Sequence, residues 1–121
     1  MYKIYLYRDK KGKEPVAEYL QKLSSENSKN SRIKLNKIRD YVKSLSLYGE
    51  SLGMPYLRHI EGDIWELRPL RDRILFVAWK KDSFFLLHVF TKKTNKTPRR
   101  EIEKAQREYK EILEGEMEYE E

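Results

Sequence analysis

Three very short breaks divide residues 56–93 and constrain the fold more than any other feature of this sequence. The runs between them are rich in aromatic and β-branched residues and predict strands over residues 56–60, 64–70, 73–80 and 84–92. The breaks are Glu61-Gly62-Asp63, Arg71-Asp72 and Lys81-Asp82-Ser83. A parallel connection needs about a dozen residues or more, so breaks of this length make neighbouring strands antiparallel. The segment is therefore predicted to form an antiparallel four-strand meander.

The flanking residues predict one more strand and three helices. Residues 2–7 alternate polar and apolar side chains, as a strand does. Apolar residues at helical spacing predict helices over residues 15–23, 30–48 and 98–114, and residues 50–55 form a loop between elements. Pro15 and Pro98 suit a first helical position, Thr97 suits an N-cap, and Gly49 and Gly115 suit the ends of the last two helices. The sequence thus predicts a single α+β domain over residues 1–121.

The distribution of charge points to a polyanionic partner. The chain has a net charge of +6, but residues 111–121 hold six Glu and no Lys or Arg, which leaves +12 on residues 1–110. A basic body with a short acidic tail attracts RNA, DNA, anionic lipid or an acidic protein, although the charge can also serve solubility alone. The chain has no cysteine and no long apolar stretch, so we expect a cytoplasmic protein without disulfides, signal peptide or membrane span.

Alternation along the strands sorts the side chains of the meander between two faces of the sheet. One face is apolar and is expected to pack on the helices; it comprises Trp65, Leu67, Ile74, Phe76, Ala78, Phe85, Leu87 and Val89. The other face, here called the wet face, is apolar near Val77, Trp79 and Leu86. Its opposite end carries Arg68, Arg73, Leu75, His88, Phe90 and Lys92. Neighbouring like charges destabilise a sheet, so this end predicts an anion-binding site, with an ordinary solvated surface as the alternative.

These residue types can cleave RNA without a metal or cofactor. The chain has two histidines, His59 and His88, without carboxylates at ligand spacing, and it lacks a glycine-rich phosphate loop, so no metal or cofactor site is predicted. RNA brings its own nucleophile, because the 2′-hydroxyl attacks the adjacent phosphate. The protein needs only to position the RNA, move protons and stabilise charge. Arg binds phosphate, a Lys among cations can transfer protons, and Phe90 can stack on an unpaired base.

Several groups of residues together carry a family resemblance. They are Ile64-Trp65-Glu66-Leu67-Arg68, Asp72-Arg73-Ile74-Leu75-Phe76, Leu87-His88-Val89-Phe90-Thr91-Lys92-Lys93-Thr94, and Lys96-Thr97-Pro98 with Glu101-Ile102 and Ala105. This set, with the tyrosine-rich first strand and the order of elements, resembles the phage-derived, HigB-like branch of the RelE/ParE toxin superfamily. The resemblance implies a microbial-RNase-like sheet flanked by helices. It also implies a metal-independent endoribonuclease that cleaves mRNA on the ribosome, inhibits translation, and is neutralised by a cognate antitoxin, often a helix-turn-helix protein of the HigA type.

The resemblance also implies which residues act. Activity in RelE-like toxins rests on Arg and Lys residues of the sheet, and the matching positions here are Arg68, Arg73, Lys92 and Lys93. The residues predicted to bind RNA are Phe90, Lys96, Arg99 and Arg100. Some relatives carry a basic residue where this chain has Glu66, and a Tyr near the start of the last helix, where this chain has none before Tyr109. The general base therefore stays open among His88, Lys92 and Lys93.

Two other functions are compatible with the same fold. One is inhibition of DNA gyrase, as in ParE-like toxins, without cleavage of RNA. The other is a nucleic-acid-binding module in which every cation contributes a similar amount and none is essential for turnover. The set Arg68, Arg73, Phe90, Lys92 and Lys93 favours the nuclease.

Overall fold

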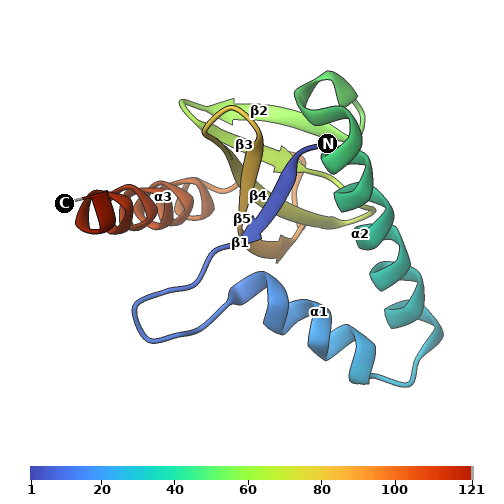
Figure 1. Ribbon diagram of the computed structural model, residues 1–121. Helices are drawn as coiled ribbons and strands as arrows, with labels where there is room; N and C mark the ends of the chain where they lie inside the picture. The colour runs from blue at the N-terminus through green and yellow to red at the C-terminus, as the bar shows by residue number, and fades with distance from the viewer. Residues whose placement is uncertain (121) are drawn as a thin grey trace.

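The fold is known from a computed structural model, which describes the backbone of residues 1–120 and the side chains of residues 1–115. The strands are β1 (Lys3–Leu6), β2 (Leu57–Glu61), β3 (Ile64–Leu67), β4 (Asp72–Trp79) and β5 (Ser83–Thr91). The helices are α1 (Pro15–Ser25), α2 (Lys29–Tyr48), the short 3-10 helix η1 (Gly49–Leu52) and α3 (Arg99–Glu120). The predicted α+β order of elements is confirmed, and Figure 1 shows their arrangement. No helix in the described part is long and apolar enough to cross a membrane.

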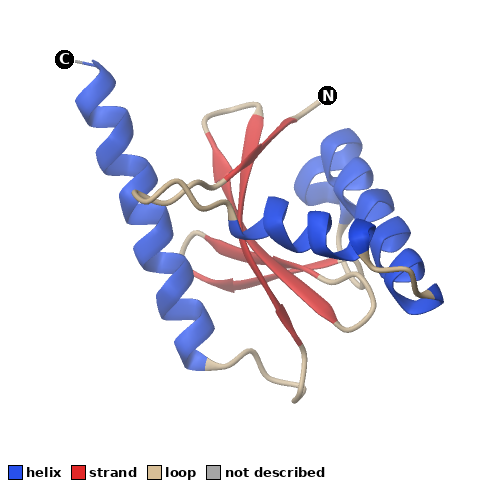
Figure 2. Cartoon of the chain, turned by 90° about the horizontal axis from the view of Figure 1, so that it is seen from below, coloured by secondary structure: helices blue, strands red, loops and turns tan. Residues whose placement is uncertain are grey.

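The strands form one five-stranded sheet in the order β1-β5-β4-β3-β2. The predicted meander is confirmed, since β2 to β5 pair antiparallel in succession. β1 adds to the far side of β5 in parallel, with Tyr5 opposite Phe85. The sheet lies between two helical layers, with α1 and α2 on one face and α3 on the other (Figure 2).

Local sequence signals explain most of the element boundaries. Pro15 occupies the start of α1, Ser28 caps α2 by accepting a hydrogen bond from the Ser31 backbone, and Gly49 ends α2 with a φ of 60°. β3 ends at Leu67, earlier than expected. Pro69 follows without an N–H for the ladder, and Leu70 adopts a φ of 58°.

Two further predicted boundaries are wrong. Gly49 was expected to end a helix and residues 50–55 to form a loop. Residues 49–52 instead form the 3-10 helix η1. Gly115 does not end the last helix, which continues to Glu120. No positive φ is found at Gly115, and Glu and Met, which favour helices, follow it in the sequence. The acidic tail expected at residues 111–121 thus begins within α3, and its side chains beyond residue 115 lie outside the described part.

A β-bulge in β5 changes which side chains share a face. Leu75 pairs with His88 but Phe76 pairs with Leu86, so Leu87 is the extra residue. As a result Phe85 and Leu87 lie on the α3 face with Leu75 and Val77, whereas Leu86 joins the core under α1 and α2. The predicted faces of these three β5 residues are therefore wrong, while those of Ile74, Phe76 and Val89 are correct.

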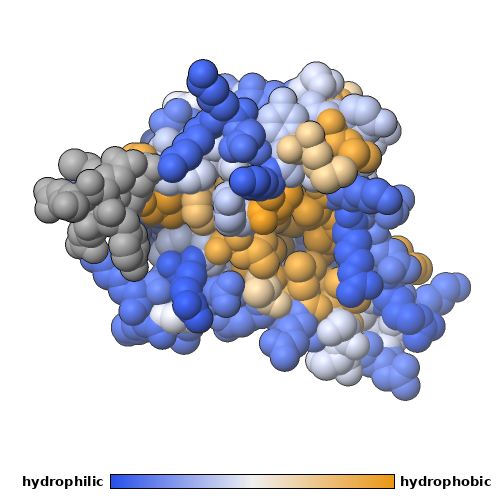
Figure 3. All heavy atoms as spheres, in the orientation of Figure 1, coloured by the Kyte–Doolittle hydropathy of each residue, from blue (hydrophilic) through white to orange (hydrophobic). Residues whose placement is uncertain are grey.

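The prediction of an exposed wet face is also wrong, because α3 covers much of this face of the sheet. Ala105, Tyr109 and Ile112 of α3 pack on Leu75 and Leu87, both fully buried. On the other side of the sheet, apolar side chains gather in a hollow between β1, α1 and α2 (Figure 3). This apolar hollow has a volume of about 590 Å³, and its lining includes Ile4, Leu6, Leu20, Val42 and Leu47.

Candidate functional site

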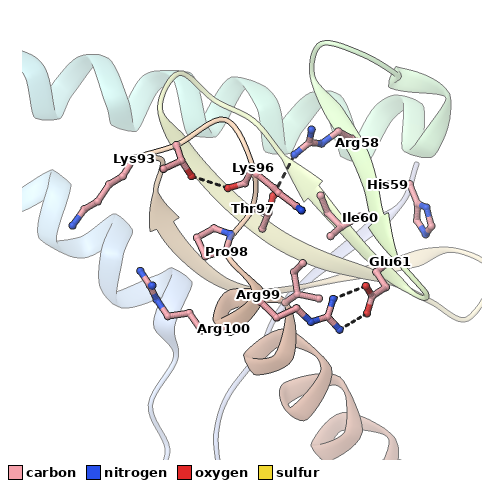
Figure 4. Close-up of a pocket in the computed structure, with 12 residues that line it drawn as sticks. Arg58, His59, Ile60, Glu61, Lys93, Lys96, Thr97, Pro98, Arg99 and Arg100 are labelled. Atoms are coloured by element: carbon pink, nitrogen blue, oxygen red, sulfur yellow. Dashed lines mark hydrogen bonds and ion pairs between the residues drawn. The ribbon is translucent and has the colours of Figure 1, made fainter.

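A groove rich in cations lies between β2, the loop after β5 and the start of α3 (Figure 4). Its volume is about 930 Å³. We call it the basic groove, after the cations that line it: Arg58, Lys93, Lys96, Arg99 and Arg100. The sequence singled out four of these five, and the fold brings them together with Arg58 from β2.

The loop of residues 92–98 is fixed at both ends. The Lys92 backbone N–H donates to the Arg71 carbonyl at 2.7 Å, and Arg71 Nη2 donates to the Lys92 carbonyl at 3.1 Å. Further along, the Thr94 hydroxyl donates to the Lys96 carbonyl at 2.9 Å. α3 begins at Arg99, and the Glu101 and Ile102 N–H groups donate to the Pro98 carbonyl. These contacts set where Lys93 and Lys96 stand beside the groove.

The cations of the groove differ in how far they are already paired. Arg99 binds Glu61 through two hydrogen bonds of 2.6 and 2.8 Å, to which Gln106 adds a third. These donors lower the pKa of the Glu61 carboxyl to about 2. Arg100 is highly exposed, and its Nε lies 3.7 Å from Glu101 Oε2. Figure 4 shows Arg99 turned toward Glu61 while Lys93 and Arg100 extend away on the other side of Pro98. Lys93, Lys96 and Arg100 are therefore the cations most available to a ligand.

A second group of cations, the arginine cluster, surrounds one buried carboxylate beside the groove. Glu66 Oε1 lies 3.3 Å from Arg58 Nη2, 3.6 Å from Arg68 Nε and 3.7 Å from Arg73 Nε. Glu66 is only 1% exposed, and its Oε2 accepts a hydrogen bond of 2.6 Å from the Thr97 hydroxyl. Thr97, which the sequence predicted as an N-cap, thus binds Glu66, and α3 begins two residues later at Arg99. Three guanidinium groups around one carboxylate leave an excess of positive charge, which an anion can neutralise.

Arg68 and Arg73 differ in their freedom to bind a ligand. Arg73 is buried, and its Nη1 donates to the Leu70 and Asp72 carbonyls at 2.8 and 2.9 Å. Burial and the nearby Arg68 lower the pKa of Arg73, although Arg stays charged in proteins. The expectation that Arg73 projects freely from a wet face is therefore wrong. Arg68 is partly exposed, and its Nε is buried without a hydrogen bond.

His88 and Phe90 lie under α3 rather than in the basic groove. His88 is 1% exposed, with Nδ1 at 2.5 Å from Glu108 and Nε2 at 3.0 Å from Glu101. Phe90 packs near it with ring centroids 6.4 Å apart. Lys92 is half-buried at the end of β5, and it does not line the groove, unlike Lys93. His59 is exposed, lies beside Trp65 and lines the groove.

Arg58 and the contact of Thr97 with Glu66 were not predicted from the sequence, in which Glu66 stood out only as a departure from relatives. The register of β2 on β3 was the signal that would have found them, because Arg58 pairs directly with Glu66. That register is hard to derive, since an irregularity between His59 and Glu61 shifts it. Among the described side chains, no three His, Cys, Asp or Glu residues are grouped so as to hold a metal ion.

One comparison with known proteins identifies the family of this chain. A family model described as phage derived protein Gp49-like (DUF891) matches residues 18–110, which include α2, the meander and the basic groove. This family is associated with RelE/HigB-like toxins of toxin–antitoxin systems, and the order of elements is consistent with a RelE-like fold. The search of curated proteins found no match.

Proposed function

Because the chain belongs to the Gp49-like family of phage-derived proteins, we propose that it is a toxin that cleaves mRNA on the ribosome and so inhibits translation. The toxin assignment follows the family. The ribonuclease activity, the dependence on the ribosome and the HigB-like character go further and are part of the proposal.

The observation that carries the proposal is that the basic groove and the arginine cluster meet at Arg58. Lys93, Lys96 and Arg100 are exposed and suited to the phosphates of a single strand. The arginine cluster lies beside them with more positive charge than Glu66 neutralises. A groove that tracks a backbone and ends at preorganised arginines suits stabilisation of a phosphorane-like transition state.

The proposed reaction uses the RNA as its own nucleophile. The 2′-oxygen attacks the adjacent phosphorus, its proton passes to a base, and the 5′-oxygen of the next nucleotide leaves with a proton from an acid. The products are a 2′,3′-cyclic phosphate and a 5′-hydroxyl. Lys93 lines the groove and is our candidate for proton transfer, and the arginine cluster beside the groove is our candidate for stabilising the charge on the phosphate. Arg73 supports Arg58 and Arg68 from behind through Glu66 and the backbone.

A reconstituted translation system tests the proposal. Purified protein should cleave a translated mRNA, leave the same RNA intact without ribosomes, and give 5′-hydroxyl ends. Cleavage should need no metal ion beyond the magnesium of the ribosome. A low concentration of EDTA should therefore slow cleavage no more than it slows translation. Intact mRNA together with trapped gyrase–DNA complexes would contradict the proposal and favour the gyrase inhibitor. Binding to RNA without cleavage would favour the binding module.

Membership in a toxin family also implies an antitoxin, for which we propose a helix-turn-helix protein of the HigA type. Two surfaces suit such a partner: the basic groove, for acidic side chains, and the apolar hollow between β1, α1 and α2, for an amphipathic helix. Salt should weaken binding at the first surface more than at the second, because exposed charges are screened. A measurement of complex affinity between about 0.05 and 0.5 M salt distinguishes them.

A further inference from the structure

Arg58 belongs to both the basic groove and the arginine cluster, and its position depends on two other residues. It pairs with Glu66 across β2 and β3, so both side chains leave the sheet at the same place. Its Nη2 lies 3.3 Å from Glu66 Oε1 and 3.2 Å from the Thr97 hydroxyl. Thr97 in turn donates to Glu66 Oε2 at 2.6 Å. One end of the guanidinium is thus held by β3 and by the residues that lead into α3.

The two anchors are far more buried than the arginine they hold. Glu66 is 1% and Thr97 8% exposed, whereas the Arg58 side chain is 36% exposed toward the groove. A buried carboxylate with both oxygens engaged has little capacity to bind a ligand itself. Its effect on a ligand is therefore expected to pass through the arginines around it.

Arg58 has more donors than Glu66 and Thr97 engage, and its side chain is partly exposed. Its Nε is buried and forms no hydrogen bond within the described structure, and a buried donor left unpaired is destabilising. A guanidinium carries five N–H donors in a rigid fork that matches two phosphate oxygens. Because the side chain is 36% exposed, a phosphate oxygen in the groove can reach the exposed part of this fork, while the buried Nε stays within the cluster.

We propose that Arg58 contacts the phosphate at the reacting centre, and that Glu66 and Thr97 are the positioning residues that aim it. This inference rests on the proposed ribonuclease function and deepens it. Arg58 supplies the stabilising charge, and the Glu66–Thr97 pair fixes the direction of its fork. Glu66 does not act as the general base.

A double-mutant cycle tests the inference with translated mRNA under single-turnover conditions. Arg58→Ala should lower the cleavage rate constant about 100-fold, because a transition-state phosphate contact is lost. Thr97→Val and Glu66→Gln should each lower it about tenfold in the wild-type background. In the Arg58→Ala background, Thr97→Val should change it by less than about twofold, because Thr97 acts through Arg58. Glu66→Gln should keep part of its effect there, because Glu66 also lies against Arg68 and Arg73. Affinity for an RNA with 2′-methoxy groups should change by less than about threefold in Thr97→Val.

The controls separate folding from positioning. Arg32→Ala removes an exposed cation of α2, away from both sites, and should cleave at the wild-type rate. Thr97→Val keeps the charges of the cluster, so it decides the question if Glu66→Gln fails to fold. If Thr97→Val lowers the cleavage rate constant by the same factor in the Arg58→Ala background as in the wild type, the positioning role is wrong. A folded Arg58→Ala protein that cleaves at the wild-type rate would overturn the contact. If the wild-type protein leaves translated mRNA intact, the proposed function itself is wrong.

Discussion

Lys92 and Lys93 are adjacent in sequence but meet different surroundings, because β5 ends at Thr91. Alternation along a strand would place Lys92, not Lys93, beside Arg73. The chain instead leaves the strand there, and Lys93 lines the basic groove. The family resemblance, unlike the alternation, had pointed to Lys93 as a site residue.

We therefore predict that Lys93→Ala impairs cleavage more than Lys92→Ala does. Loss of a proton-transfer group typically costs about 100-fold or more in rate. Lys92→Ala should cost less than about tenfold, since only its backbone helps to fix the loop. Single-turnover rate constants on translated mRNA measure both, with Lys29→Ala of α2 as an exposed control. Equal losses in the two variants would return Lys92 to the site.

Arg73 is more a structural residue than its place in the family motif suggests. Its buried guanidinium binds two backbone carbonyls and faces Glu66. Arg73→Ala would leave these acceptors unpaired and open a cavity beside Glu66, so we expect the free energy of unfolding to fall by about 2–3 kcal/mol. Urea denaturation measures this loss, with Arg32→Ala as the exposed control. An Arg73→Ala protein as stable as the wild type would show that the guanidinium is dispensable for folding.

At the scale of elements, the sequence predicted what local signals determine. Pro15 and Gly49 mark helix ends because their backbone preferences act on their own residues. The short breaks determine the meander because a connection of two or three residues can join only antiparallel neighbours. The bulge at Leu87 and the covering of the wet face by α3 depend on contacts between distant segments. For the site, Lys93, Lys96, Arg99 and Arg100 could be found because they are close in sequence, whereas Arg58 needed the register of β2.

His88 anchors α3 to the sheet through Glu101 and Glu108. We predict that His88→Ala lowers the free energy of unfolding by about 2–3 kcal/mol, because it leaves a cavity and two carboxylates without their partner. Chemical denaturation gives this loss. At a temperature where the variant stays folded, its cleavage rate constant should approach that of the wild type. A folded His88→Ala protein without activity would instead support His88 as the general base.

Two tyrosines tie elements together through carboxylates and predict a loss of stability in alkali. The Tyr7 hydroxyl donates to Glu111 of α3, and Tyr19 of α1 donates to Asp72 of β4 at 2.8 Å. Burial and these carboxylates raise the pKa of both tyrosines above the ordinary value of 10.0. The folded protein thus holds these protons more tightly than the unfolded chain, so their contribution is complete below pH 10 and falls as the pH rises further.

Urea denaturation between about pH 8 and 11 measures this effect. Tyr7→Phe and Tyr19→Phe should be less stable than the wild type near pH 8. Each should also lose stability less steeply above about pH 10, because it has one fewer group to ionise. Curves for the variants that run parallel to the wild-type curve would contradict the linkage.

For the whole molecule, charge and shape divide the surface into regions with different expected partners. The basic groove lies at one end of the sheet, beside the start of α3. The apolar hollow lies against β1 and the two N-terminal helices, on the opposite face of the sheet from α3. An antitoxin bound in the hollow would leave the groove open to RNA, whereas one bound in the groove would compete with it. Competition between antitoxin and RNA therefore reports which region is used.

The long-range field of the protein gives the last prediction. The groove offers four cations that reach a strand, Arg58, Lys93, Lys96 and Arg100, and each phosphate contact on single-stranded RNA contributes about 0.7 to the slope of log affinity against log salt. We expect a slope of about −3 for a short oligoribonucleotide. Lys96→Ala should reduce the slope by about 0.7.

Replacing Glu116, Glu118, Glu120 and Glu121 together by Gln takes the net charge from +6 to +10. This change should tighten binding at low salt while leaving it unchanged above about 0.5 M, because an effect of net charge acts through the screened field. Fluorescence anisotropy over a salt series measures both quantities. A gain in affinity that persists at high salt would mean that the glutamates oppose RNA by direct contact rather than through the field.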